Sequence, residues 1–305
     1  MHSFDLKKVL RVGTRRSALA RVQTQAVINQ LLQIQPQLQI QIIEIVTTGD
    51  KILDTALSRM SGKGVFVKEI EDKLLDGEID IAVHSMKDLP TEFPAGLKIG
   101  AITERVDPRD VFVTRFNKHL EEMPAGAKIG TSSLRRKSQL LALRPDFQVI
   151  DIRGNIDTRL RKAESAEYDG IVLAAAGLTR MGWQERIQQY LNFDLMIPAV
   201  GQGAVGVEIR EDDHTTEALL DPLNHKLTEI AVTAERKFLA TMGGGCQTPM
   251  GGFCEITNNE IIFRVFVADE DGSNFHKEKT TGKLEDAPII AERVAQRLKE
   301  KSCAA

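Results

Sequence analysis

The sequence predicts an α/β fold made of two similar lobes, followed by a small α+β domain. Apolar strands alternate with helical segments between residues 10 and 83, and the alternation returns between residues 128 and 175. Such alternation is typical of parallel sheets covered by helices. From about residue 223 the pattern changes to a helix, two strand-like runs and a terminal helix. A chain of 305 residues is long enough for two or three domains.

The first lobe begins with two strand-helix-strand units. Hydrophobic spacing predicts strands at residues 10–12, 38–46 and 79–83, with helices at residues 18–32 and 65–75 between them. A glycine loop, GKG at residues 62–64, precedes the second helix. Two such units in series predict a parallel sheet.

The second lobe repeats this order. Strands are predicted at residues 128–130, 147–152 and 171–175, and helices at residues 134–143 and 158–166. The segment FPAGLKIG (93–100) has an echo in MPAGAKIG (123–130). Either the two copies lead into equivalent strands of the two lobes, or their similarity is a coincidence.

After the glycine-interrupted segment AVGQGAVG, residues 205–209 return to strand character and are expected to rejoin the first lobe. Two crossings between the lobes would form a hinge. We therefore expect a first lobe in residues 1–103 and 204–222, a second in residues 104–203, and a third domain in residues 223–305. The third domain should contain helices at 227–242 and 287–299 and strands at 253–256 and 261–268.

Composition limits the classes of function. The 40 basic and 43 acidic residues nearly balance, which excludes a surface that attracts polyanions everywhere. Three cysteines lack the spacing of a disulfide framework, and the start MHSFDLKKVL lacks an export signal, so we expect a cytoplasmic protein. The longest apolar run, residues 171–178, is too short to span a bilayer. Six scattered histidines show no metal-binding spacing, so we expect no metal.

Basic residues gather between residues 131 and 180, where seven Arg and two Lys face six acidic residues. Arginine grips a carboxylate or phosphate through two hydrogen bonds, so this preference suggests oriented oxyanions. Several of these residues follow predicted strands, at the edge where open α/β sheets bind ligands. A solvated, salt-bridged surface is the better explanation for any single arginine, but not for five at equivalent positions. The second-lobe candidates are Thr131, Ser133, Arg135, Arg136, Arg153, Arg159 and Arg180.

The first lobe supplies matching candidates after its own strands: Arg15, Ser17, Lys63, Ser85, Lys87 and Asp88. Asp88 differs from the rest in charge. A carboxylate among cations stays ionised and suits the balancing of a developing substrate cation. The alternative is an ordinary Asp-Leu-Pro turn.

A cysteine lies in the glycine-rich segment GGGCQTPMG (243–251). Glycines allow such a loop to present the Cys246 thiol to a large group without crowding it. An incidental cysteine in a turn is the alternative.

Eight segments together resemble the porphobilinogen deaminase family in order and spacing, from about residue 10 to 252. They are GTRRSALA, GKGVFVKE, AVHSMKDLP, DPRD, GTSSLRR, RGNIDTRL, PAVGQGAVG and GGGCQTP. The resemblance implies two lobes like those of periplasmic binding proteins, hinged around a cleft, and a third domain that carries the cysteine loop. It also implies a monomer that acts in tetrapyrrole (heme) biosynthesis.

The resemblance implies a transferase whose Cys246 bears a dipyrromethane cofactor through a thioether, as a primer. Four porphobilinogen molecules would be added head to tail with loss of ammonia, and hydrolysis would release hydroxymethylbilane. Asp88 would be catalytic, assisting loss of the amino group. Lys63 and Phe66 would lie in a mobile lid. Carboxylates of substrate and cofactor would bind Arg15, Ser17, Ser85, Lys87, Thr131, Ser133, Arg135, Arg136, Arg153, Arg159 and Arg180.

One departure is Gly243, where many relatives have an acidic residue. Cys254, Cys303 and His84 match no functional position of the family. A non-catalytic two-lobed anion receptor is the main rival hypothesis, but it has no use for Cys246. A nucleic-acid-binding regulator is a second rival. The balanced charge and the presence of only three Trp and Tyr residues oppose it, so we expect neither nucleic acid nor a membrane as a partner.

Overall fold

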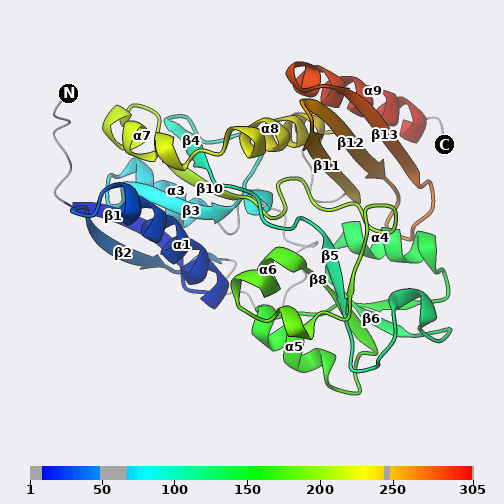
Figure 1. Ribbon diagram of the computed structural model, residues 1–305. Helices are drawn as coiled ribbons and strands as arrows, with labels where there is room; N and C mark the ends of the chain where they lie inside the picture. Colours follow the sequence, from blue (N-terminus) through cyan, green and yellow to red (C-terminus); the bar gives the residue numbers. More distant parts are fainter. Residues whose placement is uncertain (1–8, 49–66, 244–247, 304–305) are drawn as a thin grey trace. The chain divides into compact units, whose positions relative to one another are not determined.

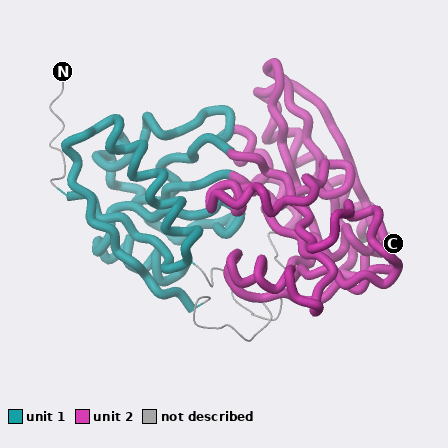
Figure 2. Tube along the Cα trace, turned by 60° about the horizontal axis from the view of Figure 1, so that its bottom comes forward, with its two compact units in different colours: residues 1–53, 62–105, 204–229 teal, residues 54–61, 106–203, 230–305 magenta. Residues whose placement is uncertain are grey.

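The computed structural model describes residues 9–48, 67–243 and 248–303 (Figure 1). Their strands form two five-stranded sheets and one three-stranded sheet. The chain divides into two compact units (Figure 2). Unit 1 takes residues 1–53, 62–105 and 204–229, and unit 2 takes residues 54–61, 106–203 and 230–305.

The sheet of unit 1 has the strand order β2-β1-β3-β10-β4. Its strands are β1 (Val9–Arg15), β2 (Gln39–Ile45), β3 (Ile81–Ser85), β4 (Leu97–Ile102) and β10 (Val205–Arg210). β1 pairs in parallel with β2 and β3, whereas β10 runs antiparallel to β3 and β4. The strands pack against the helices α1 (Ala18–Ile34), α3 (Lys68–Leu75) and α7 (His214–Leu220). The predicted return of the chain into this sheet through residues 205–209 is therefore confirmed.

The first sheet of unit 2 has the order β7-β6-β8-β5-β9. Its strands are β5 (Asp110–Val113), β6 (Lys128–Gly130), β7 (Gln148–Ile150), β8 (Gly170–Ala174) and β9 (Gln189–Tyr190). The connecting helices are α4 (Leu134–Leu143), α5 (Ile156–Ala163) and α6 (Ala175–Arg180). β5 runs antiparallel to β8 and β9, as β10 does in unit 1. The prediction of two similar α/β lobes is confirmed, because both sheets share one topology.

The echo between residues 93–100 and 123–130 does not mark equivalent strands. The first copy leads into β4, an outer strand beside β10, while the second leads into β6, which has β7 and β8 as parallel neighbours. The equivalent of β6 in unit 1 is β1. The likeness between the two segments is a coincidence of turn composition.

The C-terminal part contains the antiparallel sheet β11-β12-β13 and the helices α8 (Lys226–Thr241) and α9 (Ala287–Cys303). Its strands are β11 (Met250–Thr257), β12 (Glu260–Val267) and β13 (His276–Lys283). A core that includes Phe238, Phe263, Val265 and Leu298 is fully buried. The predicted α+β part is confirmed. The sequence analysis missed β13, whose residues HKEKTTGK carry few apolar side chains because it is an edge strand with no buried residue.

Within unit 2 the C-terminal part packs against the second lobe. The rings of Phe193 and Phe253 lie 4.4 Å apart, and Lys277 donates to the carbonyl of Asp194 at 2.7 Å. The division into three domains with the boundaries given above stays a prediction, since the compact units number two. In the described segments, no helix is both long and apolar enough to cross a membrane.

Glu71, on α3, is a buried carboxyl with 6% of its surface exposed. Its pKa is raised to about 7, chiefly by burial and also by the negative charge of the nearby Glu208, while His84 opposes this rise. The folded state therefore holds the Glu71 proton more tightly than the unfolded state does. The resulting stabilisation is complete below about pH 4.5, the ordinary pKa, and is lost as the pH rises through about 7.

Replacing Glu71 with glutamine should remove this pH dependence. Between pH 5 and pH 8 we expect the free energy of unfolding of the parent to fall by on the order of 2 kcal/mol more than that of the variant. Urea unfolding at a series of pH values measures the difference. Asp76→Asn, which changes the exposed residue at the C-terminal end of the same helix, is the matched control. Parallel pH profiles for the parent and Glu71→Gln would contradict the assignment.

Candidate active site

In unit 2, three parallel strands end in polar turns at one edge of the sheet. β6 leads into Thr131 and Ser133 at the start of α4, and β7 leads into Arg153 and the start of α5. β8 leads into α6, whose last residue is Arg180. The carboxyl ends of neighbouring parallel strands lie together, so the structure brings the second-lobe candidates to one edge, as the sequence predicts. Ser133 is the N-cap residue of α4.

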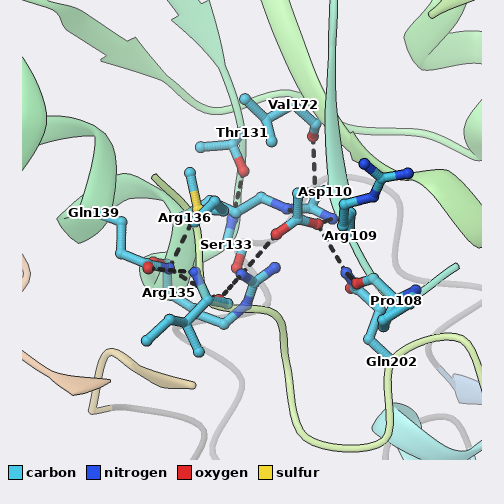
Figure 3. A network of polar contacts seen from close by, with 12 residues as sticks. Pro108, Arg109, Asp110, Thr131, Ser133, Arg135, Arg136, Gln139, Val172 and Gln202 are labelled. Atoms are coloured by element: carbon cyan, nitrogen blue, oxygen red, sulfur yellow. Dashed lines mark hydrogen bonds and ion pairs between the residues drawn. The ribbon is translucent and has the colours of Figure 1, made fainter. Parts of the chain in front are cut away.

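Arg135 and Arg136 both pair with Asp110, at the start of β5 (Figure 3). Arg135 Nη1 lies 2.7 Å from Asp110 Oδ2, and Arg136 donates to Asp110 Oδ1 from Nη2 at 2.7 Å and from Nε at 3.1 Å. Asp110 is fully buried, and the two arginine side chains are 8% and 7% exposed. Gln202 Nε2 donates to the same carboxylate at 3.0 Å. One carboxylate thus serves two guanidinium groups, which leaves a net positive charge.

The charges hold one another in their ionised forms. Burial would raise the pKa of Asp110, but the two guanidinium groups hold that pKa well below its usual value. Burial lowers the pKa of Arg135, against the opposing effect of Asp110. Arg135 also donates to the carbonyl of Ile197 at 2.6 Å, and Arg136 to that of Val172 at 3.0 Å. The pair is therefore fixed in position by the chain itself.

Arg159, Arg153 and Arg136 form a cluster of like charges. The pKa of Arg159 is lowered to about 10, chiefly by burial and also by the positive charges of Arg136 and Arg153. Arg159 Nε donates to the carbonyl of Gly154 at 2.8 Å. Burial likewise lowers the pKa of Arg180 to about 10, and its Nη2 donates to the carbonyl of Gly203 at 2.7 Å. An anionic ligand would relieve the repulsion within this cluster.

The sequence analysis did not single out Asp110, although it quoted the segment DPRD that contains it. The available signal was an acidic residue at the start of the apolar run DVFV, which forms the fully buried strand β5. A carboxylate in such a place needs a cationic partner. The sequence analysis also expected Arg135 and Arg136 to bind ligand carboxylates. The structure shows them bound to a carboxylate of the chain, and their role toward a ligand stays a prediction.

In unit 1, the candidates lie at the carboxyl ends of the adjacent parallel strands β1 and β3. Arg15 ends β1, and Ser17 caps α1, where its hydroxyl accepts from the Ala20 N–H at 3.3 Å. Ser85 ends β3 and accepts from Gln23 Nε2 at 2.8 Å. Lys87 and Asp88 follow on the 3-10 turn η2 (Met86–Asp88), and both are exposed. The five residues therefore share one edge of this sheet.

The loop that carries Cys246 lies outside the described residues, as do the predicted lid residues Lys63 and Phe66. The elements that flank the loop are described. Glu235 of α8 is fully buried and accepts from the Gly201 N–H at 2.7 Å and from the Cys254 N–H at 2.9 Å. These bonds link α8 and β11 to residue 201, next to Gln202.

β11 also contacts the segment that holds Arg135. Gly252 N–H donates to the Pro198 carbonyl at 3.2 Å, and a Cβ on Gly251 would stand only 2.7 Å from that oxygen. The preceding carbonyl, of Ile197, accepts the hydrogen bond from Arg135. The strand that follows the cysteine loop is therefore joined to the arginine cluster through residues 197–198 within unit 2.

Cys254 is buried and forms no disulfide bond with another described residue. No group of three histidine, cysteine, aspartate or glutamate side chains in the described ranges is arranged to hold a metal ion.

The sequence of the chain matches family models and known proteins over most of its length. Residues 10–218 match the family model described as porphobilinogen deaminase, dipyromethane cofactor binding domain, and residues 229–300 match the C-terminal domain model of the same family. The porphobilinogen deaminase of Geobacillus kaustophilus is 52% identical over 297 residues, covering 95% of this chain and 96% of that protein. The porphobilinogen deaminase of Brevibacillus brevis is 50% identical over 289 residues, covering 94% and 93%.

Among solved structures, the periplasmic aliphatic sulphonate binding protein SsuA from Escherichia coli is similar at 15% identity and a TM-score of 0.39. The similarity covers 77% of this chain and 70% of that one.

Proposed function

The chain belongs to the porphobilinogen deaminase family, and we propose on that basis that it condenses four porphobilinogen molecules head to tail onto a dipyrromethane primer. Each condensation releases ammonia, and hydrolysis then releases hydroxymethylbilane, the open-chain tetrapyrrole. The observation that carries the proposal is the match of residues 10–218 to the family's cofactor-binding domain.

The arginine cluster of unit 2 fits a ligand of this kind. Each pyrrole ring carries an acetate and a propionate, so primer and product bring many carboxylates. The residues that we propose to hold them in unit 2 carry several guanidinium groups, and the buried carboxylate of Asp110 neutralises only part of that positive charge. Arginine can bind each ligand carboxylate through two hydrogen bonds and so fix the orientation of its ring.

We propose Cys246 as the attachment point of the primer, through a thioether. When bound, dipyrromethane supplies the free pyrrole carbon to which the first substrate is joined. The elements on both sides of the Cys246 loop are bonded to residues 198–201, next to the carbonyl that accepts from Arg135. This connection supports a primer held by the loop and the arginines together.

Asp88 is the proposed catalytic residue. In each cycle the C–N bond of the substrate aminomethyl group breaks and ammonia leaves. A carbon–carbon bond then forms to the terminal ring, which loses its α proton. The cation that forms when ammonia leaves needs a nearby negative charge, and the exposed carboxylate of Asp88 lies at the same sheet edge as Arg15 and Ser17. Asp88 is therefore suited to stabilise that cation and to assist loss of the amino group.

The remaining assignments follow the same reasoning. Arg15, Ser17, Ser85 and Lys87 are proposed to position the incoming substrate, and Lys63 and Phe66 are proposed as parts of a lid that excludes water. We propose a cytoplasmic monomer that takes porphobilinogen as its substrate. The cysteine content, three in 305 residues, agrees with a reducing compartment.

The direct test is turnover with porphobilinogen. We expect the purified chain to release ammonia and to form hydroxymethylbilane, with four ammonia molecules for each bilane in the steady state. A colorimetric ammonia assay and absorbance of the oxidised product measure the two quantities. Binding of porphobilinogen without ammonia release would contradict the proposal and favour the anion receptor.

A further inference from the structure

A buried polar cluster lies in unit 1, outside the residues assigned so far. His84 is on β3, Glu208 on β10 and Glu71 on α3, and they are 5%, 0% and 6% exposed. His84 Nε2 stands 3.0 Å from Glu208 Oε2. Apart from this contact with His84, neither Glu208 oxygen nor Glu71 Oε1 has a hydrogen-bond partner among the residues that the structure describes. The cluster therefore places two carboxyl groups and an imidazole in the interior, where few hydrogen bonds offset the cost of removing them from water.

Stability alone does not account for this arrangement. Buried ionisable groups are costly, and apolar side chains of similar size often give an equal or more stable fold. The flanking positions on the same elements hold such side chains, as Ile70 and Val207 show. Polar groups kept in such a place can serve to fix one specific arrangement of the strands.

The cluster adjoins the turn that carries Asp88. His84 directly precedes Ser85, and it is paired with Gly206 of β10, as Ser85 is with Val205. One residue further on, the Met86 N–H donates to the Ala204 carbonyl at 3.1 Å. A side chain on Gly206 would overlap Met86 Sδ, so β10 and the η2 turn meet closely here. A shift of β3 against β10 would therefore move the η2 turn.

We propose that His84 and Glu208 are positioning residues, which lock β3 to β10 and so hold the Ser85–Asp88 turn in its reactive place. The inference rests on the proposed function, because that function makes Asp88 the catalytic group. Neither side chain contacts the reacting atoms in this account. They act through the backbone of residues 84–88.

The test compares Glu208→Gln and His84→Gln with a matched control in the same sheet. Asp80 lies just before β3, at the opposite end of that strand from the turn, and its buried carboxylate pairs with the partly exposed Arg11 at 2.8 Å and with Arg210 at 3.4 Å. Asp80→Asn should lower the melting temperature and leave kcat unchanged. Both cluster variants should lower kcat by about tenfold to a hundredfold, as expected for a displaced catalytic group. Their KM should rise as well, because the displaced turn also carries Ser85 and Lys87, whereas Asp80→Asn should leave KM unchanged.

A second measurement separates positioning from a loss of stability. In an Asp88→Glu background, where the carboxylate is already displaced, Glu208→Gln should lower kcat by much less than it does in the parent. Its effect on the melting temperature should be the same in both backgrounds. The proposal would be overturned if Glu208→Gln lowered kcat equally in both backgrounds. It would also be overturned if Glu208→Gln left kcat unchanged when made in the parent.

If Glu208→Gln does not fold, His84→Gln carries the same comparison. The activity of the parent protein distinguishes failure of the proposed function from failure of the positioning role. An inactive parent would contradict the proposed function, whereas an active parent with fully active cluster variants would contradict only the positioning role.

Discussion

Replacing Asp88 with asparagine is expected to lower kcat by about a hundredfold to a thousandfold, the size of effect seen when a charge-stabilising group is removed from an active site. The variant keeps the shape of the side chain but loses the negative charge that balances the cation left by departing ammonia. Asp88 is exposed on the η2 turn, so the substitution should leave the fold intact. Substrate affinity should also be largely preserved, because carboxylate binding depends on the basic residues.

The measurement is steady-state turnover with porphobilinogen, together with a thermal unfolding curve for each protein. Asp212→Asn, which changes another exposed aspartate of unit 1, is the control and should keep full activity. Full turnover by Asp88→Asn would remove Asp88 from the mechanism.

The second large effect concerns Asp110. Asp110→Asn leaves the buried Arg135 and Arg136 without a charged partner, and breaking a buried ion pair in this way costs about 3–5 kcal/mol of unfolding free energy. We also expect poor loading with dipyrromethane in the protein that remains folded. The reason is that the two guanidinium groups would no longer be held beside the Ile197 and Val172 carbonyls.

Urea unfolding and the cofactor-bearing fraction, measured by intact mass, report these two effects. Asp146→Asn is the matched control, because Asp146 pairs with Arg144 at the surface of the same unit and should affect neither quantity strongly. A variant at Asp110 that is as stable and as fully loaded as the parent would show that the arginine pair does not need its buried partner.

Local patterns predicted much of the fold. The apolar runs of β3 and β8 are fully or almost fully buried, and buried strands are readable from the sequence. β13 was missed because an edge strand can consist of polar residues, and β9 because two residues carry no period. The similarity of residues 93–100 and 123–130 does not correspond to equivalent strands, because the composition of a turn does not determine where the strand that follows it lies in the sheet.

The candidate site likewise contains features that the sequence predicts and features that it does not. Residues such as Arg153 and Ser85 could be placed at strand ends from the sequence, because the topology of an α/β sheet fixes that edge. The partners of Arg135 and Arg136 could not be predicted. Asp110 lies on a strand 25 and 26 residues earlier, and only tertiary packing brings it to α4. The bonds from Glu235 to residues 201 and 254 depend in the same way on the packed state.

The proposed function depends on a dipyrromethane primer tethered to Cys246. The mass of the intact protein, followed by mapping of the modified peptide, measures this attachment. We expect a mass above that of the sequence by two pyrrole units, located on the peptide that contains Cys246, and no such addition in Cys246→Ser. A catalytically competent preparation with the sequence mass and a free thiol at residue 246 would contradict it.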